Sequence, residues 1–212
     1  MPVLGAISPM CSDSGRVAPG RDNIMPTVVK RRMAAFNSKW NVYLDHLADA
    51  HGNEVQDYLV VEGKLQRPDQ VTGVCILPVM GDRIVLIQCY RHALRSQLWE
   101  AVKGFVDVGE TLAQAAAREL AEETGLSCAP AGLVPLGLMA PEASTLRGRA
   151  ALFAATRCTG ELRIGVGEIG LGRVSLFNAA ASVNLEATGG IEDASTLIAI
   201  YRYRAMAATA LA

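Results

Sequence analysis

Four charged side chains crowd the end of one predicted helix: Arg118, Glu119, Glu122 and Glu123. Residues three or four apart share a helix face, so the three carboxylates must lie close together. Acids near a helix C-terminus oppose the helix dipole by about 0.3–1 kcal/mol each. A hard divalent cation, Mg²⁺ or Mn²⁺, would turn this repulsion into shared ligation. The ordinary alternative is a solvated acidic face, which neighbouring glutamates alone do not exclude.

The residues around this cluster predict a loop that leads into a single helix. Thr111 is a favourable N-cap, and Gln114 three positions later completes a capping box. The alanine- and leucine-rich run 112–121 favours helix strongly. Gly125 stands where a helix ends in the left-handed conformation. Arg118 and Glu122, at i and i+4, are expected to pair.

The whole stretch resembles the Nudix box. Gly104 is followed after five residues by Glu110, and after seven more by the run RELAEETGL that starts at Arg118. The family cleaves nucleoside diphosphates linked to another moiety, with a metal held by this loop and helix. The resemblance implies an α+β Nudix fold, an α/β/α sandwich with a mixed β-sheet. It extends loosely over residues 36–204.

The resemblance also implies a set of metal ligands. Glu119 and Glu123 are the first ligands expected, and Glu122 would bind a second ion or orient water. Lys103, just before the box glycine, would offer its backbone carbonyl, and its ammonium would add a phosphate contact. These oxygen ligands again indicate Mg²⁺ or Mn²⁺.

The general base stays open among three glutamates. Glu122 lies in the box, Glu142 in a later loop, and Glu168 in a glycine-rich stretch where some relatives carry the base or an extra ligand. Arg118 is expected to fix the direction of one carboxylate and to contribute to catalysis through it. Glu110 is expected to pair with Arg118 or to reach the metal through water.

Substrate-binding residues are implied by similarity to the ADP-ribose pyrophosphatase-like branch. Arg91 and Glu100 fall at positions that contact substrate or organise the site there. Pro141, fifteen residues beyond the box, marks the branch. Leu146 stands near the place where the branch has a loop glutamate. Arg147 and Arg149 follow, and solvated cations at a strand edge are the ordinary interpretation of both.

The chain divides into three predicted segments. Residues 1–35, rich in Pro, Gly and Ser, are expected to be a flexible arm, with a solvated basic run at residues 30–32. Residues 36–66 are expected to form an N-terminal β-hairpin subdomain, which in related enzymes mediates dimerisation, so a homodimer is implied. Residues 67–212 are the predicted Nudix domain. Further strands are expected at 71–79, 84–90, 133–139, 150–156 and 173–176, a helical turn at 177–183, and a last helix from about residue 193.

Composition limits the partners. Of the 212 residues 50% are hydrophobic, and the net charge of −1 gives no global field to attract nucleic acid or an anionic membrane. No apolar run reaches the roughly 18–20 residues of a membrane span. Five cysteines without CxxC spacing argue against zinc, and Cys75 and Cys89 lie in apolar runs typical of a core. A cytoplasmic protein is expected.

The predicted function is hydrolysis of ADP-ribose to AMP and ribose 5-phosphate. Another nucleoside diphosphate sugar or a dinucleotide, of the ADP-glucose or GDP-mannose type, is the alternative within the enzyme class. A regulatory module that binds a nucleotide sugar with little turnover is the alternative from another class.

Overall fold

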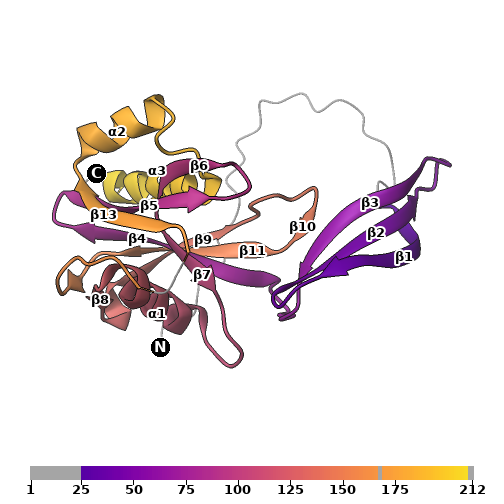
Figure 1. Cartoon of the computed structure of the whole chain (residues 1–212), viewed down its shortest axis with the longest axis horizontal. Coiled ribbons are helices and arrows are strands. Elements are labelled where there is room, and N and C mark those ends of the chain that lie inside the picture. The colour runs from indigo at the N-terminus through magenta and orange to yellow at the C-terminus, as the bar shows by residue number, and fades with distance from the viewer. Residues whose placement is uncertain (1–24, 167–168, 210–212) are drawn as a thin grey trace.

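The computed structural model describes residues 25–166 and 169–209. Most of the predicted arm, residues 1–24, and the base candidate Glu168 lie outside the described residues. The described part of the chain forms two β-sheet bodies, which Figure 1 shows side by side. One is a small N-terminal sheet and the other a larger sheet with helices on both faces.

The N-terminal sheet is a three-stranded antiparallel meander with a short fourth strand. Its order is β1-β2-β3-β10, and β10 pairs with β3 in parallel. The strands are β1 (Thr27–Phe36), β2 (Trp40–Ala48), β3 (Glu54–Gly63) and β10 (Leu146–Arg147). The predicted start of the N-terminal hairpin at residue 36 is therefore wrong. Residues 27–35, which were predicted to belong to the arm, form a full strand. Asn37 makes the turn, since its side-chain oxygen accepts hydrogen bonds from the backbone nitrogens of Lys39 and Trp40.

An ion pair explains why this first strand is ordered. The guanidinium of Arg31 donates to both carboxylate oxygens of Asp45, at 2.8 and 2.7 Å. Asp45 is only 2% exposed, and Arg31 also lies 3.5 Å from Glu62. Residues 30–32 are exposed, as predicted, and the charge of Arg31 is in addition matched by Asp45 on β2 and Glu62 on β3.

The larger sheet is mixed, as predicted. Its order is β13-β5-β4-β11-β9, with β6 paired to β5 and β7 to β4. The pair β4–β11 is parallel and the others are antiparallel. The strands are β4 (Val71–Met80), β5 (Arg83–Arg91), β6 (Ser96–Glu100), β7 (Val102–Phe105), β9 (Leu133–Met139), β11 (Arg149–Ala155) and β13 (Leu171–Phe177), with a separate short pair β8 (Ser127–Cys128) and β12 (Cys158–Thr159).

Both faces of this sheet are covered, which explains why its central strands are almost continuously apolar. Along β4, Val74 and Ile76 pack in the cluster that contains Leu120, whereas Cys75 packs in the one that contains Ile200. These clusters place the helix α1 (Leu112–Thr124) on one face and the helix α3 (Ala194–Thr209) on the other, as Figure 1 shows. The predicted α/β/α sandwich is confirmed. Cys75 and Cys89 are buried as expected, and burial raises the pKa of Cys89 to about 12.

The helices begin and end where local signals indicate. In α1 (Leu112–Thr124), Thr111 and Gln114 form the predicted capping box, and Gly125 ends the helix with φ of 71°. The predicted helical turn is the longer helix α2 (Ala179–Ala187), and the last helix is α3 (Ala194–Thr209), with a short 3₁₀ turn at Pro130–Gly132. No described helix is long and apolar enough to cross a membrane.

We expect Asp45→Asn to lower the free energy of unfolding by about 1–3 kcal/mol, since it weakens a charge-assisted bond at a buried position. The value should lie near the low end, because Arg31 is partly exposed to water. Denaturant unfolding followed by tryptophan fluorescence measures the change. Asp57→Asn, at an exposed position of the same sheet, is the control and should change stability by less than about 0.5 kcal/mol. Equal stability of the two variants would contradict this role of Asp45.

Candidate active site

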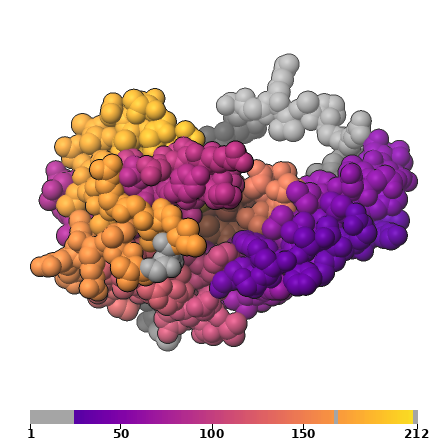
Figure 2. Space-filling view, in the orientation of Figure 1, coloured from indigo at the N-terminus to yellow at the C-terminus, as the bar shows by residue number. Residues whose placement is uncertain are grey.

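The charged end of α1 faces a cavity of about 610 Å³. The cavity lies where α1, the start of β4, the strand β7 and the N-terminal sheet meet. Figure 2 shows the molecular surface hollowed between the indigo and purple N-terminal strands and the rest of the protein. Predicted site residues that line it are Arg91, Lys103, Arg118, Glu119, Glu122 and Pro141.

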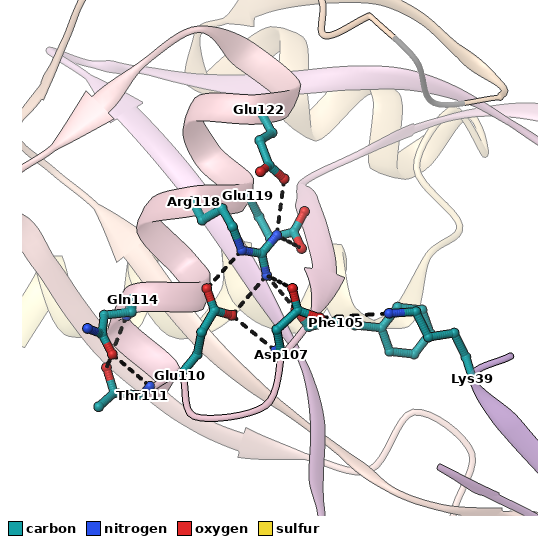
Figure 3. Close-up of polar contacts among 9 residues, drawn as sticks. All are labelled: Lys39, Phe105, Asp107, Glu110, Thr111, Gln114, Arg118, Glu119 and Glu122. Atoms are coloured by element: carbon teal, nitrogen blue, oxygen red, sulfur yellow. Dashed lines mark hydrogen bonds and ion pairs between the residues drawn. The ribbon is translucent and has the colours of Figure 1, made fainter. Parts of the chain in front are cut away.

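Arg118 stands at the centre of the acids (Figure 3). Its guanidinium donates to both oxygens of Glu110, at 2.9 and 3.0 Å, and to the carbonyl of Phe105 at 2.9 Å. One terminal nitrogen donates to Glu119 at 2.7 Å and to Glu122 at 3.0 Å. The expected pairs with Glu122 and Glu110 are present. The hydrogen bonds to Glu110 are the main cause of the raised pKa of Arg118, and the same bonds lower the pKa of Glu110.

Glu119 and Glu123 lie on the buried face of α1, and each is 5% exposed. The carboxyl group of Glu119 occupies the space beside Gly104, where an added Cβ would lie 1.8 Å from its carboxyl carbon. A carboxylate oxygen of Glu123 lies 3.4 Å from the backbone nitrogen of Lys103. The box glycine is therefore required by a tertiary contact, because it leaves room for an acid from the helix.

The donor set fits a hard divalent cation. Glu119, Glu122, Glu123 and the backbone of Lys103 offer oxygen ligands, which Mg²⁺ and Mn²⁺ prefer. One nitrogen of Arg118 bonds both Glu119 and Glu122, so a positive group already occupies the place between those carboxylates. Among the described residues, no three His, Cys, Asp or Glu side chains converge on one point in this conformation. Ligation by Glu119 and Glu122 would thus require both carboxylates to turn away from Arg118.

A second chain of ion pairs includes two cations that line the cavity, Arg91 and Lys103. Arg91 donates to the two carboxylate oxygens of Glu100 at 2.9 and 2.6 Å, and Glu100 is 1% exposed. The ammonium of Lys103 lies 2.5 Å from Glu100 and 2.7 Å from Asp193. The phosphate contact of the Lys103 ammonium stays a prediction, and in this conformation two carboxylates engage that ammonium. Asp193 also accepts from the backbone nitrogen of Thr196 at 2.8 Å and so caps α3.

The pKa shifts along this chain of ion pairs follow from the same contacts. Burial alone would lower the pKa of Lys103, but the attraction of Asp193 and Glu100 outweighs it and the pKa is raised. Burial would likewise raise the pKa of Asp193, yet Lys103 and Thr196 together lower it. The hydrogen bond to Glu100 is the main cause of the raised pKa of Arg91. All three groups therefore stay charged near neutral pH.

The later loop brings only part of its predicted residues to the cavity. Pro141 and Leu146 line it. Glu142 is exposed, accepts hydrogen bonds from the hydroxyl and backbone nitrogen of Ser144, and has a pKa lowered by those bonds. Glu142 is not among the described residues that line the cavity. This conformation therefore gives no support to Glu142 as the base.

Residues of the N-terminal sheet form a wall that was not predicted. Trp40 packs edge-on against Phe105 with ring centroids 5.6 Å apart, and the ammonium of Lys39 lies 5.1 Å from the Phe105 ring. All three line the cavity. Trp40 was expected in a strand, but no local signal indicates which face of that strand meets the domain that follows.

Comparison with known proteins agrees with this geometry. The profile of the NUDIX domain matches residues 69–162. Over 59 residues the chain is 39% identical to the ADP compounds hydrolase NudE of Escherichia coli (strain K12). These 59 residues are 28% of this chain and 32% of that protein. The aligned segment thus spans about a third of the length of this curated relative.

A solved structure described as that of an ADP compounds hydrolase superposes with a TM-score of 0.72. The two chains are 21% identical, and the match covers 88% of this chain and 96% of the other. At this identity the likeness shows the fold. The fold and the box together define an α/β/α protein with an acid-lined cleft. Residues 69–162 match the NUDIX domain, in agreement with the box at residues 104–126.

We expect Gly104→Ala to lower turnover at least about 100-fold, because its methyl group would push Glu119 out of place. Steady-state kinetics on a nucleotide sugar, together with thermal unfolding, would measure this. Gly109→Ala, in the loop that follows β7, is the control, since nothing lies within 4 Å of its added Cβ and only its positive φ of 83° opposes it. It should lose about 1 kcal/mol of stability and keep most activity. Full activity of Gly104→Ala would show that turnover does not require Glu119 at this position beside Gly104.

Proposed function

We propose that the protein hydrolyses the diphosphate bond of a nucleoside diphosphate sugar, with ADP-ribose as the first candidate and AMP and ribose 5-phosphate as products. The observation that carries this proposal is a pair of buried acids on α1: Glu119 lines the 610 Å³ cavity, and Glu123 lies 3.4 Å from the backbone nitrogen of Lys103, which lines the same cavity. That volume falls within the roughly 300–1,000 Å³ typical of small-molecule sites. The relatives named as ADP compounds hydrolases favour an ADP-containing substrate.

Mg²⁺ or Mn²⁺ is the proposed cofactor. When bound, the ion supplies charge neutralisation of the phosphate oxygens and a lowered pKa for water. Glu119, Glu123 and the carbonyl of Lys103 would hold it, and Glu122 would hold a second ion or orient water. The protein's own contribution is the placement of these donors, because the buried face of α1 holds Glu119 beside the box glycine Gly104.

Three glutamates remain candidates for the base, and the geometry favours Glu122. Its side chain is 54% exposed and lines the cavity, so its carboxylate can accept a proton from a water molecule beside the substrate. Arg118 would hold Glu122 in position between turnovers. Arg91, held in position by Glu100, would contact the phosphates.

A homodimer through the N-terminal sheet is also proposed. Strand β1 is exposed along its whole length and lies at the edge of its sheet. Its apolar side chains Val28, Val29, Met33 and Phe36 are 51–71% exposed. Exposed apolar edge strands favour pairing with another chain.

The alternative from another class is a module that binds a nucleotide sugar with little turnover. Two observations favour it: Leu146 stands where the ADP-ribose branch has a loop glutamate, and Arg118 already engages two of the acids. The separating experiment screens ADP-ribose, ADP-glucose, GDP-mannose and a dinucleotide, each with Mg²⁺ and with Mn²⁺, for release of phosphomonoesters. We expect hydrolysis of ADP-ribose. Tight binding by calorimetry without any product would establish the module instead.

Glu123→Gln should reduce kcat for the preferred substrate at least about 100-fold while the fold is retained, since metal charge stabilisation is worth several kcal/mol. Circular dichroism and thermal unfolding would confirm the fold. Glu161→Gln, which removes an exposed acid on a nearby loop, is the control and should keep wild-type kcat. An unchanged kcat in Glu123→Gln would remove Glu123 from the metal site.

A further inference from the structure

Five cationic side chains among the described residues line the 610 Å³ cavity, and their charges are not equally available to a substrate. A diphosphate is a multiply charged anion, and a cation already paired with a carboxylate offers it less net charge. The five are Lys39, Arg91, Lys103, Arg118 and Arg149.

Four of these cations have acidic partners. Arg91 and Lys103 share the buried Glu100, and Arg118 bonds three glutamates. Lys39 makes the weakest pair, at 3.8 Å from Asp107. These contacts hold the walls of the cavity, but they also neutralise much of its positive charge.

Arg149 differs from the other four. Its guanidinium donates to the carbonyl of Asp69 at 3.2 Å and to the amide oxygen of Gln70 at 3.3 Å, and both acceptors are neutral. In the described part of the chain, no carboxylate lies within ion-pair distance of it. The carboxylate of Asp69 is itself engaged by Arg67. Arg149 therefore presents an uncompensated charge at the wall of the cavity.

Arg149 also lies where two cavities meet. It lines the large cavity together with Leu146, and both residues line a neighbouring cavity of about 350 Å³. This second cavity lies between the N-terminal sheet and the segment 140–149, next to the pairing of β10 with β3. Arg31 and Arg147 line it as well, but both already pair with Glu62.

We propose that Arg149 and this second cavity form an anion subsite for a phosphate group on the part of the substrate farthest from the acids of α1. The planar guanidinium offers paired donors that match phosphate oxygens. The inference rests on the proposed function, and it specifies that function: a nucleoside diphosphate sugar with a further phosphomonoester on its sugar is preferred to the same compound without it.

Arg147 provides a matched control for this subsite. It lies two residues from Arg149 and lines the same second cavity, but its guanidinium lies 2.9 Å from Glu62. Removing Arg147 therefore removes a charge of the same kind from the same cavity. A general effect of positive charge would appear in both variants, whereas a direct contact would appear only in Arg149→Gln.

The test measures binding without turnover. ADP-ribose, and ADP-ribose with an added phosphate on its terminal ribose, are titrated by calorimetry into the full-length chain in EDTA. We expect the wild type and Arg147→Gln to bind the phosphorylated ligand roughly 10- to 100-fold more tightly, as expected for a charge-assisted hydrogen bond. Arg149→Gln should bind both ligands equally. Should Arg149→Gln not fold, Arg149→Lys keeps the charge without the planar donors and should retain only part of the preference.

Two results would overturn the subsite: equal affinity of the wild type for the two ligands, or equal loss of preference in Arg149→Gln and Arg147→Gln. A wild type that hydrolyses ADP-ribose with Mg²⁺ but shows no preference would sink the subsite alone. A wild type that neither binds nor hydrolyses either ligand would sink the proposed function, and the subsite with it.

Discussion

The structure depends on one guanidinium placed among acids. Glu110, which precedes α1, and Glu119 and Glu122 in its last turns would repel one another, and Arg118 bonds all three. The same side chain donates to the carbonyl of Phe105, so it ties the helix to the strand that precedes it. Because the guanidinium stands between two carboxylates, it holds the acids of the site together. In the proposed metal site, Glu119 and Glu122 would hold a divalent ion in place of this guanidinium.

The sandwich brings this cluster together with a second one. The strand β7 carries Gly104, which leaves room for Glu119, and Lys103, whose ammonium reaches Asp193 at the start of α3. Helices on opposite faces of the sheet are thus both joined to one short strand. A change at either helix would be transmitted to the same few backbone atoms, which are the ones expected to hold the ion.

The N-terminal sheet completes the cavity rather than standing apart from it. Trp40 and Lys39 supply one wall, and β10 joins β3 beside Arg149. The charges of the cavity therefore divide into paired cations that build walls and one cation with neutral partners. This division separates residues that shape the site from the residue we propose for substrate selection.

The sequence by itself determined the structural features that depend on residues close together along the chain. The capping box at Thr111, the end of α1 at Gly125 and the buried runs of β4 and β5 appear as predicted, because their causes lie within a few residues. Only the tertiary structure decided which charges from distant parts of the chain meet. Lys103 pairs with Asp193, Arg31 with Asp45, and Arg149 with no acid in the described residues. A side chain's partner is set by how distant strands and helices pack, and no spacing along the chain contains that information.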